Sequence, residues 1–210
     1  MFENVSRRQF VTGSAAAALA FGLVGCGGNG GGESAEGGDA SGAIKVGIMG
    51  PQSGSVSNYG IACANGAQLY FKQLNADGGI NGKQVEYTVE DEKGDATEAV
   101  NVYNMLVENG VVGIVGDVTT GPTVAVAKAS VADNMPCVTP SATAADVVTY
   151  GENYFRACVT DPEQGRVMAN FAAEQGYKTV ATIYLSGDDY SEGVNNAFCE
   201  EAEAKGITVA

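Results

Sequence analysis

The chain has 210 residues and is strongly acidic, with 25 Asp and Glu against 11 Lys and Arg, a formal net charge of −14 at pH 7, and neither His nor Trp. Such a chain is a poor partner for nucleic acids, because phosphate binding depends on clusters of Lys and Arg that this sequence does not have. The absence of His excludes a Ser-His-Asp relay and a His-ligated metal within these residues. We therefore expect neither a cofactor nor a nucleic acid as its partner.

Residues 1–25 have the features of an export signal, which plays no part in the fold. Arg7 and Arg8 precede an uncharged apolar stretch, Ala15–Val24, that is shorter than the roughly 20 residues needed to span a bilayer. The pattern from Ser6 to Phe10 resembles a twin-arginine signal, which a receptor reads as an address. An ordinary secretory signal with a chance Arg pair is the alternative.

The four residues ending at Cys26, Leu-Val-Gly-Cys, resemble the lipobox of bacterial lipoproteins, in which the Cys becomes residue one and carries a diacylglyceryl group. We therefore expect lipidated Cys26 to anchor an exported protein at the outer face of the cytoplasmic membrane or in the periplasm. A buried or free Cys near a conventional cleavage site is the alternative. Residues 26–42 are rich in Gly, Ser and acidic residues without apolar periodicity, which predicts a flexible tether.

Strand and helix patterns alternate beyond the tether. We first expect four strands, each followed by a helix. The strands are predicted at Ala43–Met49, Val85–Glu90, Val111–Val115 and Pro136–Thr139, and the helices that follow them at Tyr59–Asn75, Asp95–Asn109, Pro122–Asn134 and Ala144–Tyr150. An extended segment at Tyr154–Val159 follows, and then a helix at Asp161–Gln175 that is capped by its first residue. The last predicted elements are a strand at Thr179–Leu185, a turn at Ser186–Gly193, a helix at Asn195–Lys205 and a strand at Gly206–Ala210. This rhythm predicts an α/β fold with a parallel sheet and helices on both faces. A strand in the last residues is unusual for a complete domain, so we expect a fragment of a longer protein.

Two hydroxyl-rich turns follow neighbouring strands of the predicted sheet. Gly116–Pro122 follows the strand at Val111–Val115, and Pro140–Thr143 follows the strand at Pro136–Thr139. Open α/β sheets bind ligands at the carboxyl ends of their strands. A helix beginning near Pro122 presents unpaired N–H groups and a positive dipole end, which suit a carboxylate. The alternative is that these Thr and Ser residues only cap helices, which is their commonest use.

Several segments, in this order, carry a resemblance to a known family: IKVGIMGPQSG, NYG, NGAQLYFKQLNADGGINGKQVE, VEDEKGDATEAV, GDVTTGPT, TPSAT, YFRACVTDPEQG and DDYSEG. Together they resemble the amino-terminal half of a type I periplasmic solute-binding protein, of the branched-chain amino-acid receptors of ABC transporters. The resemblance implies two α/β lobes that close on a ligand. Lobe one would occupy residues 43–150, the first hinge crossing residues 151–160, and the start of lobe two residues 161–210. It also implies a binding protein, not an enzyme, that delivers a small zwitterionic solute to a membrane permease.

The resemblance further implies residues of the ligand cleft. By position, Thr120 would hold the ligand carboxylate, the Ser141 carbonyl would accept from the ligand ammonium, and Thr143 would contact the same polar head. The other implied cleft residues are Tyr59 at the cleft mouth, Tyr190 in lobe two, and Ser53 and Thr119 in the adjoining loops. Because Lys93 and Thr119 stand where a family member has a disulfide, that bridge is absent here.

Several alternatives remain open from the sequence. A sensory ligand-binding domain would share this fold, and family members also take amides and other small polar solutes. An enzyme is disfavoured because the sequence has neither a G-x-S-x-G elbow nor a G-x-x-x-x-G-K-[ST] loop. Four cysteines besides Cys26 allow three disulfide pairings in an exported protein, although buried free thiols are favoured, at Cys63, Cys137, Cys158 and Cys199.

Overall fold

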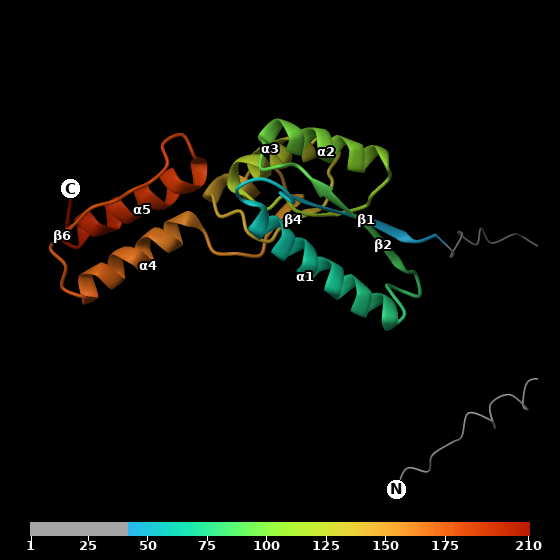
Figure 1. Ribbon diagram of the computed structural model, residues 1–210, viewed down its shortest axis with the longest axis horizontal. Helices are drawn as coiled ribbons and strands as arrows, with labels where there is room; N and C mark the ends of the chain where they lie inside the picture. The colour runs from blue at the N-terminus through green and yellow to red at the C-terminus, as the bar shows by residue number, and fades with distance from the viewer. Residues whose placement is uncertain (1–41) are drawn as a thin grey trace, which may run out of the picture. The chain divides into compact units, whose positions relative to one another are not determined.

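Figure 1 shows the computed structural model, which describes residues 42–210. The predicted export signal, Cys26 and the predicted tether up to residue 41 lie outside the described residues. The elements are, in chain order, β1 (Ile44–Gly50), α1 (Ser57–Ala76), β2 (Val85–Asp91), α2 (Ala96–Glu108), β3 (Ile114–Val115), α3 (Thr120–Ser130), β4 (Cys137–Thr139), the 3-10 helix η1 (Ala145–Val148), β5 (Tyr154–Arg156), α4 (Asp161–Glu174), β6 (Thr179–Val180), α5 (Asp189–Ala204) and β7 (Thr208–Val209).

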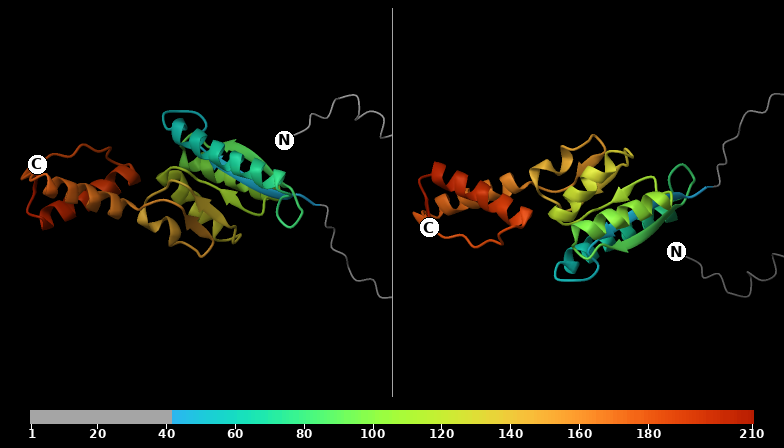
Figure 2. Two further views of the ribbon diagram at one scale, coloured as in Figure 1. Left: turned by 90° about the horizontal axis from the view of Figure 1, so that it is seen from below. Right: turned by 90° about the horizontal axis from the view of Figure 1, so that it is seen from above.

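The first five strands form one sheet in the order β2-β1-β3-β4-β5, and every pair is parallel. Helices α2 and α3 pack together on one face of this sheet and α1 lies on the other, as the two views in Figure 2 show. The predicted parallel α/β fold with helices on both faces is therefore confirmed. The main core lies between the sheet and the α2–α3 pair, and its largest buried side chains are Met49, Tyr103, Leu106, Ile114, Val126, Val147 and Tyr154.

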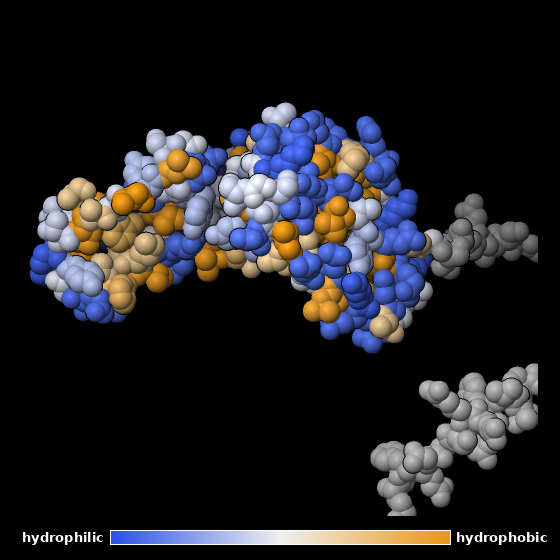
Figure 3. Space-filling model, in the orientation of Figure 1, coloured by the Kyte–Doolittle hydropathy of each residue, from blue (hydrophilic) through white to orange (hydrophobic). Residues whose placement is uncertain are grey.

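A second, smaller core belongs to α4, α5 and the two-stranded parallel sheet β6-β7. Helices α4 and α5 approach closely because Gly165 has no side chain, and a Cβ at this position would lie 2.5 Å from the Phe198 nitrogen. Figure 3 shows apolar residues on the surface of this part, where Val167, Met168 and Phe171 of α4 are all more than half exposed. No element among residues 42–210 covers these side chains.

Strand β3 is shorter than predicted because its expected first residue belongs to the end of a helix. The Val111 N–H donates to the Leu106 carbonyl, and the Gly110 N–H donates to the Val107 carbonyl. This is the paired hydrogen bonding of a Schellman motif, with Gly110 at φ 76°. The strand begins only at Ile114, so Val111 closes α2 instead of extending the sheet.

The predicted strand at Thr179–Leu185 is also wrong in length, because only its first two residues pair with β7. Residues 181–185 have no partner strand in the described part of the chain, and Ile183 is fully exposed. The turn predicted at residues 186–193 ends at Asp188, whose side chain accepts a hydrogen bond from the Ser191 N–H (2.8 Å) and caps α5. Helix α5 therefore begins six residues before the predicted Asn195.

Helix α4 begins at the predicted Asp161, but its cap is the preceding residue. The Thr160 hydroxyl oxygen accepts a hydrogen bond from the Glu163 N–H (3.4 Å), so Thr160 is the N-cap and Asp161 is the first helical residue. Helix α3 likewise begins at Thr120, two residues before the predicted Pro122. Both shifts matter below, because they decide which hydroxyl groups are occupied as caps.

Candidate functional site

The carboxyl ends of β3 and β4 lie side by side, with Ile114 paired to Cys137 and Val115 to Val138. The two hydroxyl-rich turns therefore meet at one edge of the sheet, as predicted. Strand β1 lies on the other side of β3, and the strand order reverses between β1 and β3. In open α/β sheets the ligand crevice forms outside the carboxyl ends of the strands at such a reversal.

The turn after β3 leads into a helix whose N-terminus has no side-chain cap. Thr119 holds the N-cap position with extended backbone angles, yet its side chain makes no cap hydrogen bond. Its hydroxyl oxygen is buried without any hydrogen-bond partner. Thr120 follows as the first residue of α3 and is 5% exposed. The alternative that these hydroxyls only cap a helix therefore fails at Thr119, and the N–H groups of this helix end face no acceptor from their own cap.

The turn after β4 is organised by Thr139. Its hydroxyl oxygen accepts hydrogen bonds from the Ser141 N–H (3.3 Å) and the Ala142 N–H (2.9 Å). The Thr143 carbonyl accepts from the Asp161 N–H (2.9 Å), whereas the Thr143 hydroxyl oxygen is buried with no partner. Two adjoining strand ends thus each present one buried hydroxyl that nothing in the described chain satisfies, at Thr119 and Thr143.

Ser53 lies at the same edge but is already occupied. Its hydroxyl donates to the Asp91 carboxylate (2.6 Å), which also accepts from the N–H groups of Gln52, Ser53 and Lys93 at 2.8–3.3 Å. Burial alone would raise the pKa of Asp91, but these hydrogen bonds hold the pKa below its usual value. Ser53 and Asp91 therefore fix the loop between β1 and α1, and the structure shows no free hydroxyl at Ser53.

The two predicted tyrosines are exposed, Tyr59 on α1 by 61% and Tyr190 on α5 by 44%. Burial raises the pKa of Tyr190, and the nearby groups Asp161, Tyr59 and Asp188 raise it further. Tyr59 and Tyr190 are thus close enough to interact electrostatically, although neither side chain makes a hydrogen bond within the described residues.

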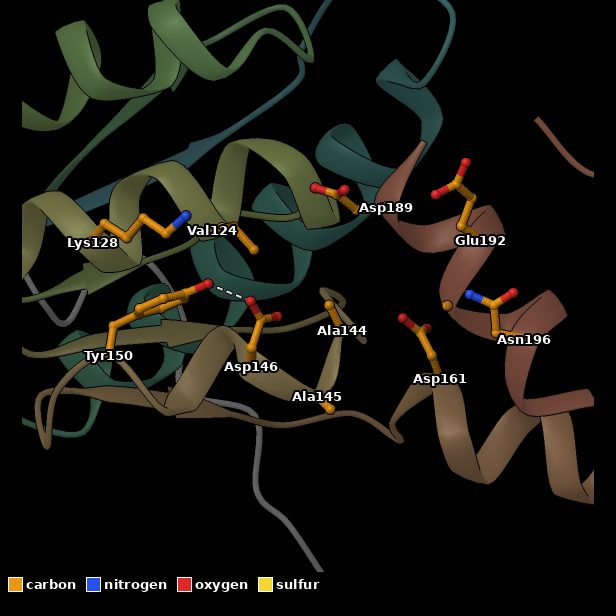
Figure 4. Close-up of a pocket in the computed structure, with 11 residues that line it drawn as sticks. Val124, Lys128, Ala144, Ala145, Asp146, Tyr150, Asp161, Asp189, Glu192 and Asn196 are labelled. Carbon is orange, nitrogen blue, oxygen red and sulfur yellow. Dashed lines mark hydrogen bonds between the residues drawn. The ribbon is translucent and has the colours of Figure 1, made fainter. Parts of the chain in front are cut away.

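A pocket of about 500 Å³ lies between α3 and η1 on one side and α5 on the other (Figure 4), and it contains none of the predicted site residues. The Tyr150 hydroxyl donates to Asp146, and the Lys128 ammonium lies 4.9 Å from the centre of the Tyr150 ring. The pocket is strongly acidic because four carboxyl groups face it, those of Asp146, Asp161, Asp189 and Glu192. It therefore differs in character from the neutral hydroxyl edge.

Asp161 is a functional candidate that sequence reasoning reduced to a cap. It is 2% exposed, and a Cβ added to Gly193 of α5 would lie 2.6 Å from its carboxylate oxygen. Burial raises the pKa of Asp161, and the nearby Thr143 hydroxyl, which lies outside hydrogen-bond geometry, and then the Arg156 guanidinium partly oppose this rise. Its backbone reaches Thr143 and its carboxylate reaches α5, so Asp161 connects the hydroxyl edge with the second core. Only the Asp-Pro pair at a helix start could have indicated it.

A model of the periplasmic binding protein family matches residues 43–210. The chain belongs to this family. Over 167 residues this periplasmic binding protein is 35% identical to Leu/Ile/Val-binding protein homolog 3 of Brucella melitensis, covering 79% of this chain and 45% of the relative. It is 34% identical over 173 residues to the leucine-, isoleucine-, valine-, threonine- and alanine-binding protein of Pseudomonas aeruginosa, covering 81% and 46% of the two chains.

Solved structures agree with these relatives. The substrate-binding protein LivJ of the Streptococcus pneumoniae branched-chain amino acid transporter, in complex with isoleucine, matches with a TM-score of 0.75 at 33% identity, over 80% of this chain and 48% of that one. The leucine-binding protein LivK of Thermotoga maritima matches with a TM-score of 0.75 at 28% identity, over the same shares. This periplasmic binding protein thus spans about half the length of the relatives it matches.

The predicted resemblance and the predicted fold class are confirmed. The family is one of solute-binding proteins, and membership implies an exported location. Among residues 42–210 no helix has the length and apolar composition needed to cross a membrane. The same residues contain no cluster of three or more His, Cys, Asp or Glu side chains that could hold a metal ion. The domain boundaries and the ligand contacts of single residues stay predictions.

Proposed function

We propose that this chain forms part of an extracytoplasmic solute-binding protein that captures a small zwitterionic ligand, a branched-chain or related amino acid, and delivers it to an ABC transporter permease. The observation that carries the proposal is the pair of buried, unpartnered hydroxyls at adjoining strand ends, Thr119 and Thr143, beside the uncapped start of α3. A buried hydroxyl without a partner costs free energy, so a ligand that satisfies both is stabilised. The relatives named for leucine, isoleucine and valine support the substrate class.

The chemistry of this edge suits a carboxylate held without a formal counter-charge. The Thr120 hydroxyl and the first N–H groups of α3 supply donors at the positive end of an 11-residue helix. Neutral donors avoid the cost of burying an unpaired charge in the site. The Ser141 N–H is already bound to the Thr139 hydroxyl, which holds this turn in place. The Ser141 carbonyl is then the group that accepts a hydrogen bond from the ligand ammonium. Tyr59 and Tyr190 then contact the remainder of the ligand when lobes 43–150 and 161–210 close around the hinge at 151–160.

The membrane attachment belongs to the same proposal. Lipidated Cys26 and a tether over residues 26–42 would hold the domain near its permease after export by a twin-arginine signal. A sensor that reports to a receptor, or a receptor for an amide or other small polar solute, is the alternative function. A direct sensor would more often carry its own membrane-spanning helix, and the Leu-Val-Gly-Cys sequence favours a tethered receptor.

The test measures ligand binding by the full chain in a panel of leucine, isoleucine, valine, small amides and benzoate. A ligand present at a hundredfold excess over its dissociation constant stabilises the folded state by about 2.7 kcal/mol, which raises the melting temperature. We expect a rise with leucine, isoleucine or valine, and loss of most of this rise in Thr143→Val. Thr88→Ala, on the exposed face of β2, is the matched control and should respond as the wild type. A rise only with an amide would discard the amino acid, and an unchanged rise in Thr143→Val would refute the site.

A further inference from the structure

Two carboxyl groups are buried together just below the proposed binding loop. Glu92 follows β2 directly and Asp117 follows β3 by two residues, so β1 lies between the strands that carry them. Both residues are 0% exposed. Both carboxylate oxygens of Glu92 and one of Asp117 have no hydrogen-bond partner, and no ion pair with Lys or Arg reaches either group in residues 42–210. Two ionised carboxylates in such a place would be costly, because each is desolvated and they repel each other.

The Asp117 carboxylate also organises the backbone that carries the proposed ligand contacts. The second carboxylate oxygen of Asp117 accepts a hydrogen bond from the Val118 N–H. The backbone N–H of Asp117 donates to the Tyr154 hydroxyl (2.8 Å). That hydroxyl donates in turn to the Gly116 carbonyl (2.7 Å). Val118 is 3% exposed and packs over Gly50, where a Cβ would lie 2.5 Å from the valine side chain. The position of Thr119, one residue later, therefore depends on Asp117.

We propose that Glu92 and Asp117 share one proton, and that this protonated pair holds the β3–α3 loop in its ligand-binding conformation. The charge of Glu92 acts directly on Asp117, so the two carboxyl groups are neighbours, and a proton on one of them can be donated to the other. The shared hydrogen bond satisfies oxygens that otherwise have no donor. Ionisation of both groups puts two like charges side by side in a buried site, which displaces the loop and weakens ligand binding. The part of this inference that concerns the ligand rests on the proposed function.

The groups that face the pair agree with a proton held near neutral pH. Burial raises the pKa of Glu92; the nearby N–H groups of Gly94 and Asp95 partly oppose this rise without forming hydrogen bonds to the carboxylate, the Asp91 charge adds to it, and the resulting pKa is about 7. Burial, and then the charge of Glu92, raise the pKa of Asp117 well above its usual value. The Tyr154 hydroxyl of β5 accepts from the Asp117 N–H, and the groups that raise the pKa of Tyr154 besides burial include Cys137 of β4 and Tyr103 of α2. Lys93 is exposed, and within residues 42–210 its ammonium forms no ion pair with either carboxyl group.

The sign of the effect follows from these raised pKa values. The contribution of Glu92 to stability is fully present below the ordinary carboxyl pKa near 4 and is lost as the pH rises through about 7, whereas that of Asp117 is lost only as the pH rises through the raised pKa of Asp117. Because the chain has no His, no other side chain with an unperturbed pKa titrates between pH 5 and 8. Glu92 is therefore expected to contribute to the pH dependence in that range, together with any contribution from Asp161, whose pKa burial also raises.

The experiment follows the proton directly in the full chain without ligand. Infrared difference spectra of the wild type should show a protonated carboxylic acid at pH 6 that weakens as Glu92 titrates at about pH 7 and disappears only when Asp117 also ionises at higher pH. Glu92→Gln, which can donate to an ionised Asp117, should lack this band. Glu86→Gln, the same change at an exposed site on β2, should keep it. Absence of the band in the wild type at pH 6, or its persistence in Glu92→Gln, would overturn the proposal.

The loop is followed in the same samples by amide hydrogen exchange at Val118, Thr119 and Thr120. At a pH high enough to abolish this band in the wild type, these amides should exchange about tenfold faster in the wild type than in Glu92→Gln after correction for intrinsic rates, and equal exchange would refute the positioning role. Leucine affinity, measured by calorimetry at pH 6 and at that higher pH, should fall about tenfold in the wild type and stay constant in Glu92→Gln. If leucine fails to bind at both pH values while the band and the exchange behave as expected, the proposed function is wrong and the proton-sharing pair stands.

Discussion

Thr119→Val is the substitution that most directly tests whether the edge of the sheet is built for a ligand. An N-cap threonine normally stabilises its helix, and its replacement by a residue without a hydroxyl costs about 0.5–2 kcal/mol. Thr119 occupies the N-cap of α3, but its hydroxyl bonds to no N–H group and is buried. Valine has nearly the same shape and suits the extended backbone at this position, so the change removes an unsatisfied polar group and little else.

The expected effect on stability is therefore opposite in sign to that of an ordinary cap. Leaving a buried hydroxyl unsatisfied costs about 1–3 kcal/mol, and its removal should recover about 1 kcal/mol of that. For a domain of this size, about 1 kcal/mol shifts the melting temperature by roughly 2–4 °C. Thr160→Val is the matched control, because Thr160 holds the N-cap of α4 and its hydroxyl does accept from an N–H group. We expect Thr119→Val to raise the melting temperature and Thr160→Val to lower it by a similar amount.

Ligand binding should change in the reverse direction. A hydrogen bond to a charged group contributes about 1.5–3 kcal/mol, which corresponds to roughly 10- to 150-fold in affinity. Calorimetry with leucine should therefore show weaker binding by Thr119→Val, although this variant is expected to be the more stable protein. Binding by Thr160→Val should be unchanged. A loss of stability in Thr119→Val equal to that in Thr160→Val would show that Thr119 is an ordinary cap, and the reasoning about this helix end would fail.

Three further substitutions test the frame around the site. Tyr154→Phe should destabilise the protein by about 2 kcal/mol in urea unfolding, because it leaves a buried N–H and a buried carbonyl of the β3–α3 loop unsatisfied. Asp91→Asn should flatten the acid side of the stability profile. Since hydrogen bonds hold the Asp91 pKa below its usual value near 4, its contribution is present above that pH and is lost as the pH falls. Gly165→Ala should cost about 1–3 kcal/mol by forcing α4 and α5 apart.

Two of these changes have a matched control in the same chain. Tyr103→Phe removes a hydroxyl that donates to the exposed Asp133 at 2.8 Å, so its cost should be smaller, about 1 kcal/mol. Gly66→Ala, in α1 with open space around the added Cβ, should stabilise the protein by up to about 1 kcal/mol. Equal losses in the two Tyr→Phe variants, or a gain in Gly165→Ala, would contradict the packing described. An acid profile unchanged by Asp91→Asn would contradict the role of its hydrogen bonds.

The order and type of the elements followed from local patterns, because apolar periodicity and turn residues act over a few neighbours. The failures share another cause. Val111 reads as a strand residue, yet the Gly110 turn closes α2 through it. The apolar run after Thr179 stays irregular because a strand needs a partner beside it. Strand length and helix ends are therefore set by distant pairing and by cap geometry, which the local sequence does not contain.

Some residues of the candidate site could likewise be predicted from local sequence patterns, whereas others depend on the strand order. The turns that carry Thr120 and Thr143 could be found because Gly, Pro and hydroxyl residues follow short apolar runs, and the predicted sheet joins their ends. Glu92 and Asp117 could not, because each reads as an ordinary charged residue in a turn. They become neighbours only through the strand order β2-β1-β3, which places two loops 25 residues apart in sequence at one buried point.

An acidic chain that binds a carboxylate must keep its own negative charges from opposing the ligand. At this edge two local arrangements limit that opposition. Asp91 is surrounded by hydrogen-bond donors from the β1–α1 loop, and the Glu92–Asp117 pair keeps one proton. The remaining field near Thr119 and Thr120 is then set mainly by the positive end of α3. Binding of an anionic head thus depends on a proton buried beneath the site. The same edge would lose its affinity when that proton leaves, while the neutral hydroxyls above it stay unchanged.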